Sequence, residues 1–148
     1  MTAADPFAAA FEAARAAAAA QEVPVGAAVV RAGAVIAAAG NRTLRDRDPT
    51  AHAEMLAIRD ACEAIGNERL LECDLYVTLE PCAMCAAAIS FARIRRLYFA
   101  ACDPKGGAVE HGPRFFSQPT CHHAPEVYGG IRESEAAELL RGFFQARR

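Results

Sequence analysis

Two short motifs in this chain combine side chains that commonly bind metals with a carboxylate that can move protons. The first is His52-Ala53-Glu54, and the second is Pro81-Cys82-Ala83-Met84-Cys85. The 26 residues between them, 55–80, leave room for one helix and one strand. An imidazole, two thiols and a carboxylate in this order point to a metal site at which water can be activated.

Cys82 and Cys85 are expected in the first turn of one helix. Residues three apart in a helix share a face, and Pro81 suits a helix start, where its missing N–H would have no partner. The positive end of the helix dipole favours thiolate, the form that binds zinc at about 2.3 Å. A redox dithiol or half of a structural zinc site is an alternative for such a pair, although a redox dithiol gives His52 no role.

His52 and Glu54 can approach one site only if that site lies beyond a helix end, because residues two apart point to opposite sides within a helix. Thr50 is a plausible N-cap for such a helix, directly after Pro49. The motifs therefore predict two helix N-termini that face each other across one zinc ion. The predicted metal ligands are His52, Cys82 and Cys85. Three protein ligands and one water describe a catalytic zinc site, whereas structural sites have four protein ligands.

Glu54 is the predicted proton carrier. Zinc lowers the pKa of a water that it binds to about 7, and a carboxylate beside the metal can take that proton. Attack on an amino-bearing ring carbon then needs one proton on the ring nitrogen and another on the leaving amine, and a single carboxylate can deliver both. H-x-E followed by P-C-x-x-C is the signature of zinc deaminases. The predicted chemistry is hydrolytic removal of an amino group from a nucleobase.

The elements around these motifs predict a layered α/β domain, with parallel strand pairing after an initial hairpin. The hairpin turns at Ala32-Gly33, and Ser134 is expected to cap the last helix, with Phe143 and Phe144 on its apolar side. Residues 103–125 show no period and predict a functional loop or a hidden short element. The expected helices are 7–20 (stopped by Pro24), 50–66 (closed by Gly66), 82–92 and one that follows Ser134; the expected strands are 25–31, 34–41, 75–79 and 97–101.

Composition is that of an ordinary globular protein with a single domain over residues 1–148. Hydrophobic residues make up 53% and charged residues 23% of the 148. No uncharged apolar run is long enough to cross a bilayer. Glu12 and Arg15 interrupt the alanine-rich start, which therefore predicts a helix rather than an export signal, and this favours the cytoplasm. In that compartment the six cysteines are expected as thiols or metal ligands. The net charge of −2 excludes an overall positive charge that would attract nucleic acid.

The chain also resembles the bacterial tRNA-specific adenosine deaminases, which belong to the cytidine deaminase-like superfamily. The resemblance covers almost the whole length and extends well beyond the metal motifs. The segments that carry it are 22–26, 40–42, 48–54, 75–82, 103–107, 143–144 and 147–148.

This resemblance implies a three-layer α/β/α fold with a mixed five-stranded sheet. It implies one Zn²⁺ per subunit, a homodimer, and conversion of adenosine to inosine at the wobble position of a tRNA anticodon stem-loop. Asn41 would hydrogen-bond the flipped base. Val23 and the Ala51 backbone would line the pocket, and Asp103 and Lys105 would lie near the flanking nucleotides.

Two other functions remain open from the residues. A deaminase of a free nucleobase or nucleoside would use the same zinc, water and Glu54. A non-catalytic zinc module that binds RNA would need a fourth protein ligand, such as Cys62 or His122.

Several further residues have a structural interpretation beside a functional one. Cys121-His122-His123 could hold a second metal, but a third ligand is not evident. Phe115-Phe116 could stack on bases or pack in a core or dimer interface, and Cys62, Cys73 and Cys102 are expected as small apolar fillers. The arginines that could contact RNA locally are Arg93, Arg95, Arg96, Arg147 and Arg148.

Overall fold

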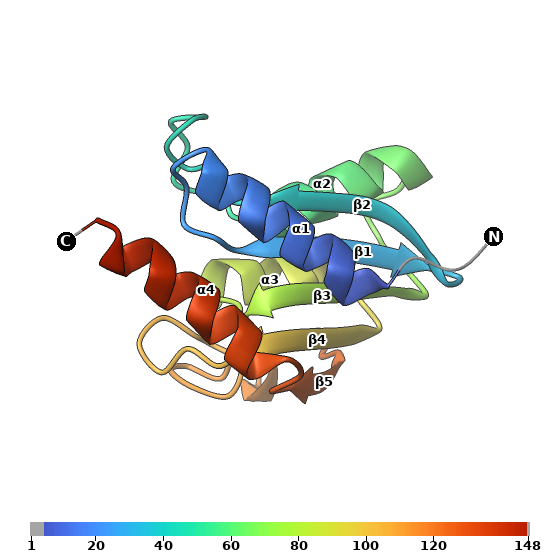
Figure 1. Ribbon diagram of the computed structural model, residues 1–148. Coiled ribbons are helices and arrows are strands. Elements are labelled where there is room, and N and C mark those ends of the chain that lie inside the picture. Colours follow the sequence, from blue (N-terminus) through green and yellow to red (C-terminus); the bar gives the residue numbers. More distant parts are fainter. Residues whose placement is uncertain (1–4, 148) are drawn as a thin grey trace.

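A mixed five-stranded sheet forms the middle layer of the computed structural model, which describes residues 5–147 (Figure 1). Its strand order is β2-β1-β3-β4-β5. β1 runs antiparallel to both β2 and β3, whereas β3, β4 and β5 run parallel to one another. The strands are β1 (Gly26–Arg31), β2 (Ala34–Gly40), β3 (Cys73–Leu79), β4 (Arg96–Ala101) and β5 (Glu126–Gly129).

Two helices cover each face of this sheet, which confirms the expected α/β/α layers. α1 and α4 lie together on one face, and α2 and α3 lie on the other (Figure 1). Apolar side chains fill the space between helices and sheet on both faces. Phe11 of α1 and Ala136 of α4 belong to the core on one face, and Leu75 and Ile89 belong to the core on the other. The helices are α1 (Pro6–Ala19), α2 (Ala53–Ile65), α3 (Ala83–Phe91) and α4 (Glu133–Gln145).

Local sequence explains several element ends. Asp5 caps α1 by accepting the Phe7 N–H at 3.0 Å. Ala32 and Gly33 both have positive φ, at 49° and 78°, which suits the two-residue hairpin turn between β1 and β2. Gly66 closes α2 in the left-handed conformation, as expected.

Three expectations about element ends are corrected. Thr50 does not cap α2; its hydroxyl and amide both donate to Asp48, and His52 takes the N-cap position. α4 begins at Glu133, so Ser134 lies inside the helix. α1 ends well before Pro24, because Gln21 already has a φ of 68°. The short element expected within the 103–125 loop is confirmed as a 3-10 helix, η1 (Phe115–Ser117), and β5, which was not expected from the local sequence pattern, follows the loop.

The sheet brings segments that are distant in sequence to one edge. β3 and β4 are parallel, so their carboxyl ends coincide, and antiparallel pairing places the start of β1 and the end of β2 beside them. α2 and α3 also begin at this edge (Figure 1). Within residues 5–147, no helix has the length and apolar character needed to cross a membrane.

Candidate metal centre and active site

His52, Cys82 and Cys85 meet at this edge of the sheet, as the motif spacing predicts. The Nδ1 atom of His52 lies 3.6 Å from the Cys82 Sγ and 3.5 Å from the Cys85 Sγ, and the three ligand atoms all lie within 4.8 Å of one another. A tetrahedral zinc ion with bonds of about 2.3 Å to sulfur and about 2.0 Å to nitrogen would hold a nitrogen and a sulfur roughly 3.5 Å apart. The donor set and its spacing therefore fit zinc.

Both helix N-termini contribute a ligand from the N-cap position. His52 precedes α2 and Cys82 precedes α3, and neither side chain caps its own helix. The hydrogen bond from Cys85, aided by His52, lowers the pKa of Cys82 to about 4, whereas the contact with Cys82 and burial raise the pKa of Cys85. One thiol thus stabilises the other as thiolate, the form that binds zinc.

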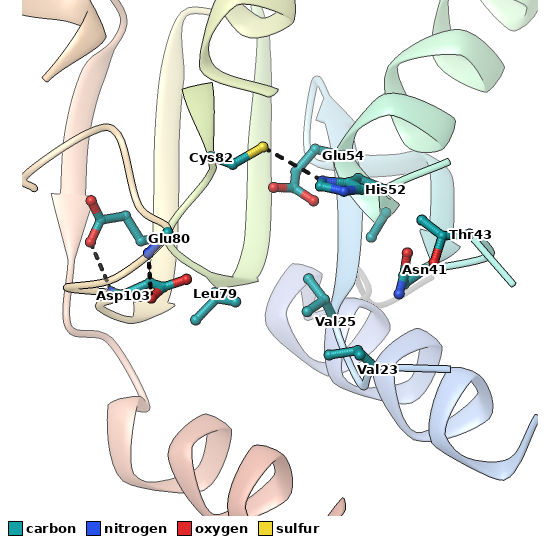
Figure 2. A pocket seen from close by; sticks show the side chains of 12 residues that line it. Val23, Val25, Asn41, Thr43, His52, Glu54, Leu79, Glu80, Cys82 and Asp103 are labelled. Atoms are coloured by element: carbon teal, nitrogen blue, oxygen red, sulfur yellow. Dashed lines mark hydrogen bonds between the residues drawn. The ribbon is translucent and has the colours of Figure 1, made fainter. Parts of the chain in front are cut away.

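Glu54 lies in the first turn of α2 with 4% of its surface exposed. Burial raises its pKa to about 7, which is the range in which one carboxyl can both accept and return a proton at neutral pH. Figure 2 shows its carboxylate pointing into the pocket between Cys82 and His52. His52 and Glu54 thus approach one site beside the N-terminus of α2, as expected.

These groups open into a pocket of about 370 Å³. His52, Cys82 and Glu54 lie at one end of it, and two walls face each other across the space (Figure 2). Apolar Val23, Val25 and Leu79 contribute to the walls, which suits the faces of a planar ring. The lining residues are Val23, Val25, Asn41, Thr43, His52, Ala53, Glu54, Leu79, Glu80, Cys82, Asp103 and Gly106.

Asn41 follows β2 and lines this pocket with an unused hydrogen-bonding group. It is 8% exposed, and among the described residues its Oδ1 is the buried side-chain oxygen or nitrogen that has no hydrogen-bond partner. Such an orphaned group is costly unless a ligand pairs with it.

The other expected substrate residues divide into two groups. Val23 and Asp103 line the pocket, whereas Ala51 and Lys105 do not. The Ala51 carbonyl already accepts the Arg42 N–H at 2.9 Å, so this part of its backbone is occupied. Lys105 is exposed on the loop beside Asp103.

Sequence reasoning gave no role to two buried glutamates beside the pocket, Glu22 and Glu80. The side chain of each is 0% exposed. Each lies in a segment that carries the family resemblance; Glu80 itself lines the pocket, and Glu22 directly precedes the lining residue Val23. The available signal was an acidic residue beside an apolar strand, which by itself does not distinguish a surface charge from a buried one.

The remaining candidates have structural contacts. Among residues 5–147, His52, Cys82 and Cys85 form the one cluster that could hold a metal, so Cys121-His122-His123 is not a second site there. Instead the Cys121 thiol donates to the His123 carbonyl, and the His123 Nε2 lies 2.7 Å from the Ile94 carbonyl.

The aromatic and arginine candidates are also sorted by their positions. Phe116 packs against the core and lies edge-to-face with Phe115. Phe144, which was expected on the apolar side of the last helix, is 47% exposed. Arg95 and Arg96 pair with Asp74 and Glu126 at the start of β4, the opposite end of the sheet from the pocket. Arg147 donates a hydrogen bond to Gln21 and lies over the ring of Phe143, and Arg148 falls outside the described residues.

Comparison with known proteins identifies the class to which this site belongs. Residues 3–101 match the family model of the cytidine and deoxycytidylate deaminase zinc-binding region. The chain therefore belongs to this family of zinc-binding deaminases. Within it, the chain is 70% identical over 127 residues to the tRNA-specific adenosine deaminase of Agrobacterium fabrum, covering 86% of this chain and 84% of the relative. The expected resemblance and the expected zinc are both confirmed.

Solved structures agree with this assignment. One, from a study of A-to-I editing by tRNA:A34 deaminases at the wobble position, is 66% identical with a TM-score of 0.90, covering 91% of this chain and 98% of its own. The guanine deaminase from Nitrosomonas europaea is 28% identical with a TM-score of 0.76, covering 93% of this chain and 82% of its own.

Proposed function

We propose that this chain, as a single catalytic domain, converts adenosine to inosine at the wobble position of a tRNA anticodon. The observation that carries the proposal is the extent of the similarity to tRNA adenosine deaminases. It reaches 70% and 66% identity over most of the chain, far beyond the zinc motifs. The guanine deaminase shares the fold at 28% identity, so the motifs and fold alone do not select the substrate.

His52, Cys82 and Cys85 would hold one zinc ion per subunit. When bound, zinc would lower the pKa of a water molecule to about 7 and so supply a nucleophile at neutral pH. Glu54 would accept a proton from the attacking water and deliver it to N1 of adenine as the C6–O bond forms. It would then take the proton of the new C6 hydroxyl and deliver it to the amino group, which leaves as ammonia as the C6–N6 bond breaks and the C6 carbonyl of inosine forms. Adenosine and water thus become inosine and ammonia.

Asn41 and the apolar walls would hold the base in position. The Asn41 amide offers both an acceptor and a donor to the edge of a purine, and its Oδ1 has no partner within the described chain. Val23 and Leu79, which line the pocket, would lie against the faces of the ring. Asp103, which lines the pocket, and Lys105, exposed on the same loop, are proposed to contact the nucleotides beside the flipped base.

The anticodon stem-loop is the proposed binding partner, with recognition concentrated at the pocket. The net charge of −2 gives no general attraction to RNA. Arg147 is proposed to contact the loop, because it is exposed and donates a hydrogen bond to Gln21, two residues before the lining residue Val23. A tRNA substrate is consistent with the expected cytoplasmic location.

A homodimer is proposed in addition. Phe91 and Leu71 are 66% and 58% exposed, and the hydrogen bond between the Leu70 amide and the Ala92 carbonyl joins their two segments. An exposed apolar surface of this kind is typical of protein contacts. Analytical ultracentrifugation of the zinc-loaded protein would show a dimer mass if this is right and a monomer mass if it is wrong.

A substrate panel tests the proposed reaction. The zinc-loaded protein is incubated with a tRNA that carries adenosine at position 34, and separately with adenine, guanine and cytidine. A matched tRNA with guanosine at position 34 serves as the control. Nucleoside analysis by mass spectrometry is expected to show inosine from the first tRNA alone. Xanthine from guanine, or uridine from cytidine, without inosine in the tRNA would show that the site takes a free base or nucleoside instead.

A further inference from the structure

Glu22 and Glu80 are fully buried beside the pocket, yet no step of the proposed reaction uses them. They lie on opposite sides: Glu22 precedes the Val23 wall, and Glu80 follows β3 next to the Asp103 wall. A buried carboxylate is costly unless hydrogen bonds satisfy it. The hydrogen-bond partners of these two side chains therefore indicate what each of them holds in place.

Glu80 binds the amides of the loop that forms one wall. Its Oε2 accepts the N–H groups of Val109, Glu110 and His111 at 3.1, 2.9 and 3.2 Å. Its Oε1 accepts the Asp103 N–H at 3.0 Å and lies 2.8 Å from the His111 Nδ1. Since an ionised carboxylate only accepts hydrogen bonds, this imidazole nitrogen is the donor. One side chain thus joins both ends of the 103–111 loop (Figure 2 shows its contact with Asp103).

Gly107 shows how closely this loop wraps around the carboxylate. A Cβ atom at this position would lie 2.5 Å from the Glu80 carboxyl group and 2.6 Å from the Asp103 carbonyl. Only a residue without a side chain leaves room for that approach. The same turn carries Gly106 and Asp103, which line the pocket.

Glu22 makes the corresponding contacts on the other side. Its Oε1 accepts the Leu44 N–H at 3.1 Å, and its Oε2 accepts the Arg45 N–H at 2.8 Å and the Arg45 Nε at 3.3 Å. These residues belong to the loop that begins with Asn41 and Thr43, both of which line the pocket. Arg45 also donates to the Asn41 carbonyl.

We propose that Glu22 and Glu80 are positioning residues that hold the two walls of the pocket and so set the fit of the RNA substrate. The inference rests on the proposed function. Glu80 holds the wall of Asp103, which faces the nucleotides beside the target. Glu22 holds the wall of Asn41, which faces the base itself.

Steady-state deamination of an anticodon stem-loop with adenosine at position 34 tests this division. Glu80→Gln keeps the size of the side chain but replaces an acceptor with a donor. We expect its KM to rise about tenfold, the effect of losing hydrogen bonds to a charged group. Its kcat should change by less than roughly threefold, because contacts made equally to substrate and transition state affect KM rather than kcat. In Glu22→Gln, kcat falls as well, because the base is no longer aligned. Glu126→Gln, at an exposed glutamate on the far end of the sheet, is the matched control and should change neither constant.

A merely structural role gives a different result. Misfolded molecules lower the active fraction and hence the apparent kcat, but they leave KM unchanged. A Glu80→Gln variant with unaltered KM would therefore overturn the inference. If that variant does not fold, His111→Ala removes one peripheral hydrogen bond and should raise KM by a smaller factor; an unchanged KM there overturns the inference equally.

Hydrogen exchange provides a measurement that does not depend on activity. In Glu80→Gln, the amides of Val109, Glu110 and His111 should exchange at least about tenfold faster, while those of α2 keep their protection. Equal protection in wild type and variant would contradict the positioning role. If the wild-type protein leaves the stem-loop unmodified, the proposed function fails instead, whatever the exchange data show.

Discussion

Replacement of Glu54 by glutamine should separate chemistry from metal binding and from folding. Glu54→Gln keeps the shape of the side chain and removes its ability to carry protons. The carboxyl group would serve two proton transfers, and general acid–base catalysis contributes roughly 100- to 10,000-fold. We expect kcat to fall by at least this factor, equivalent to about 3–5 kcal/mol of barrier. Zinc content should remain at one per chain, because His52, Cys82 and Cys85 are intact.

The same variant has an expected effect on stability in the metal-free protein. Burial raises the pKa of Glu54 from 4.5 to about 7, so the ionised carboxylate is less favourable in the folded chain than in the unfolded one. This penalty is absent below the unfolded pKa, grows as pH rises from about 4.5 to 7, and is complete above the folded pKa. With 1.36 kcal/mol for each pKa unit, it amounts to about 3 kcal/mol at pH 8.

Two assays measure these effects. Zinc is determined by atomic emission, and turnover by inosine formation in a tRNA with adenosine at position 34. Urea unfolding of the metal-free wild type and Glu54→Gln at pH 4 and pH 8 gives the difference in stability. The variant should gain stability relative to wild type as pH rises. Loss of zinc in Glu54→Gln, or retained turnover, would refute the assignment of Glu54 as a proton carrier that does not bind the metal.

Three further predictions follow from single side chains. His52→Ala should lose zinc, and its melting temperature should not rise when zinc is added, whereas that of the wild type should. Thermal scans with and without the metal check this, and a zinc response equal to that of the wild type would exclude His52 as a ligand. Asn41→Ala should retain zinc but lose about 10- to 100-fold in kcat/KM, since one buried hydrogen bond to the base is removed; steady-state kinetics check this, and wild-type kinetics would show that Asn41 is a turn residue only. Burial alone would raise the pKa of Glu22, but hydrogen bonds from Arg45 and Leu44 lower it. The ionised Glu22 therefore stabilises the fold above pH ~4.3, and this stabilisation is lost as pH falls through the folded pKa. The difference in unfolding free energy between wild type and Glu22→Gln should shrink from pH 7 to pH 3, and a difference independent of pH would contradict this.

The metal centre could be predicted from the sequence because its geometry is local. Cys82 and Cys85 are three residues apart at a helix start, and His52 and Glu54 bracket the first residue of another helix. Short-range spacing fixes such positions. The hairpin at Ala32-Gly33 was predictable for the same reason, since two residues with positive φ suffice for the turn.

The rest depends on contacts between distant segments. Thr50 had the chemistry of an N-cap, but Asp48 binds its hydroxyl and amide instead. β5 is four residues long and pairs with β4 across a loop of more than twenty residues, so no local period reveals it. The roles of Glu22 and Glu80 exist only after the fold has brought their loops together.

X-ray absorption at the zinc edge of the purified protein tests the metal centre most directly. If His52, Cys82 and Cys85 bind the metal and solvent occupies the fourth position, the spectrum should show two sulfur atoms at about 2.3 Å and two nitrogen or oxygen atoms at about 2.0–2.1 Å. In Cys85→Ser one of the two sulfur contributions should disappear. A third sulfur in the wild type, or a spectrum that Cys85→Ser leaves unchanged, would contradict a catalytic zinc site at this position.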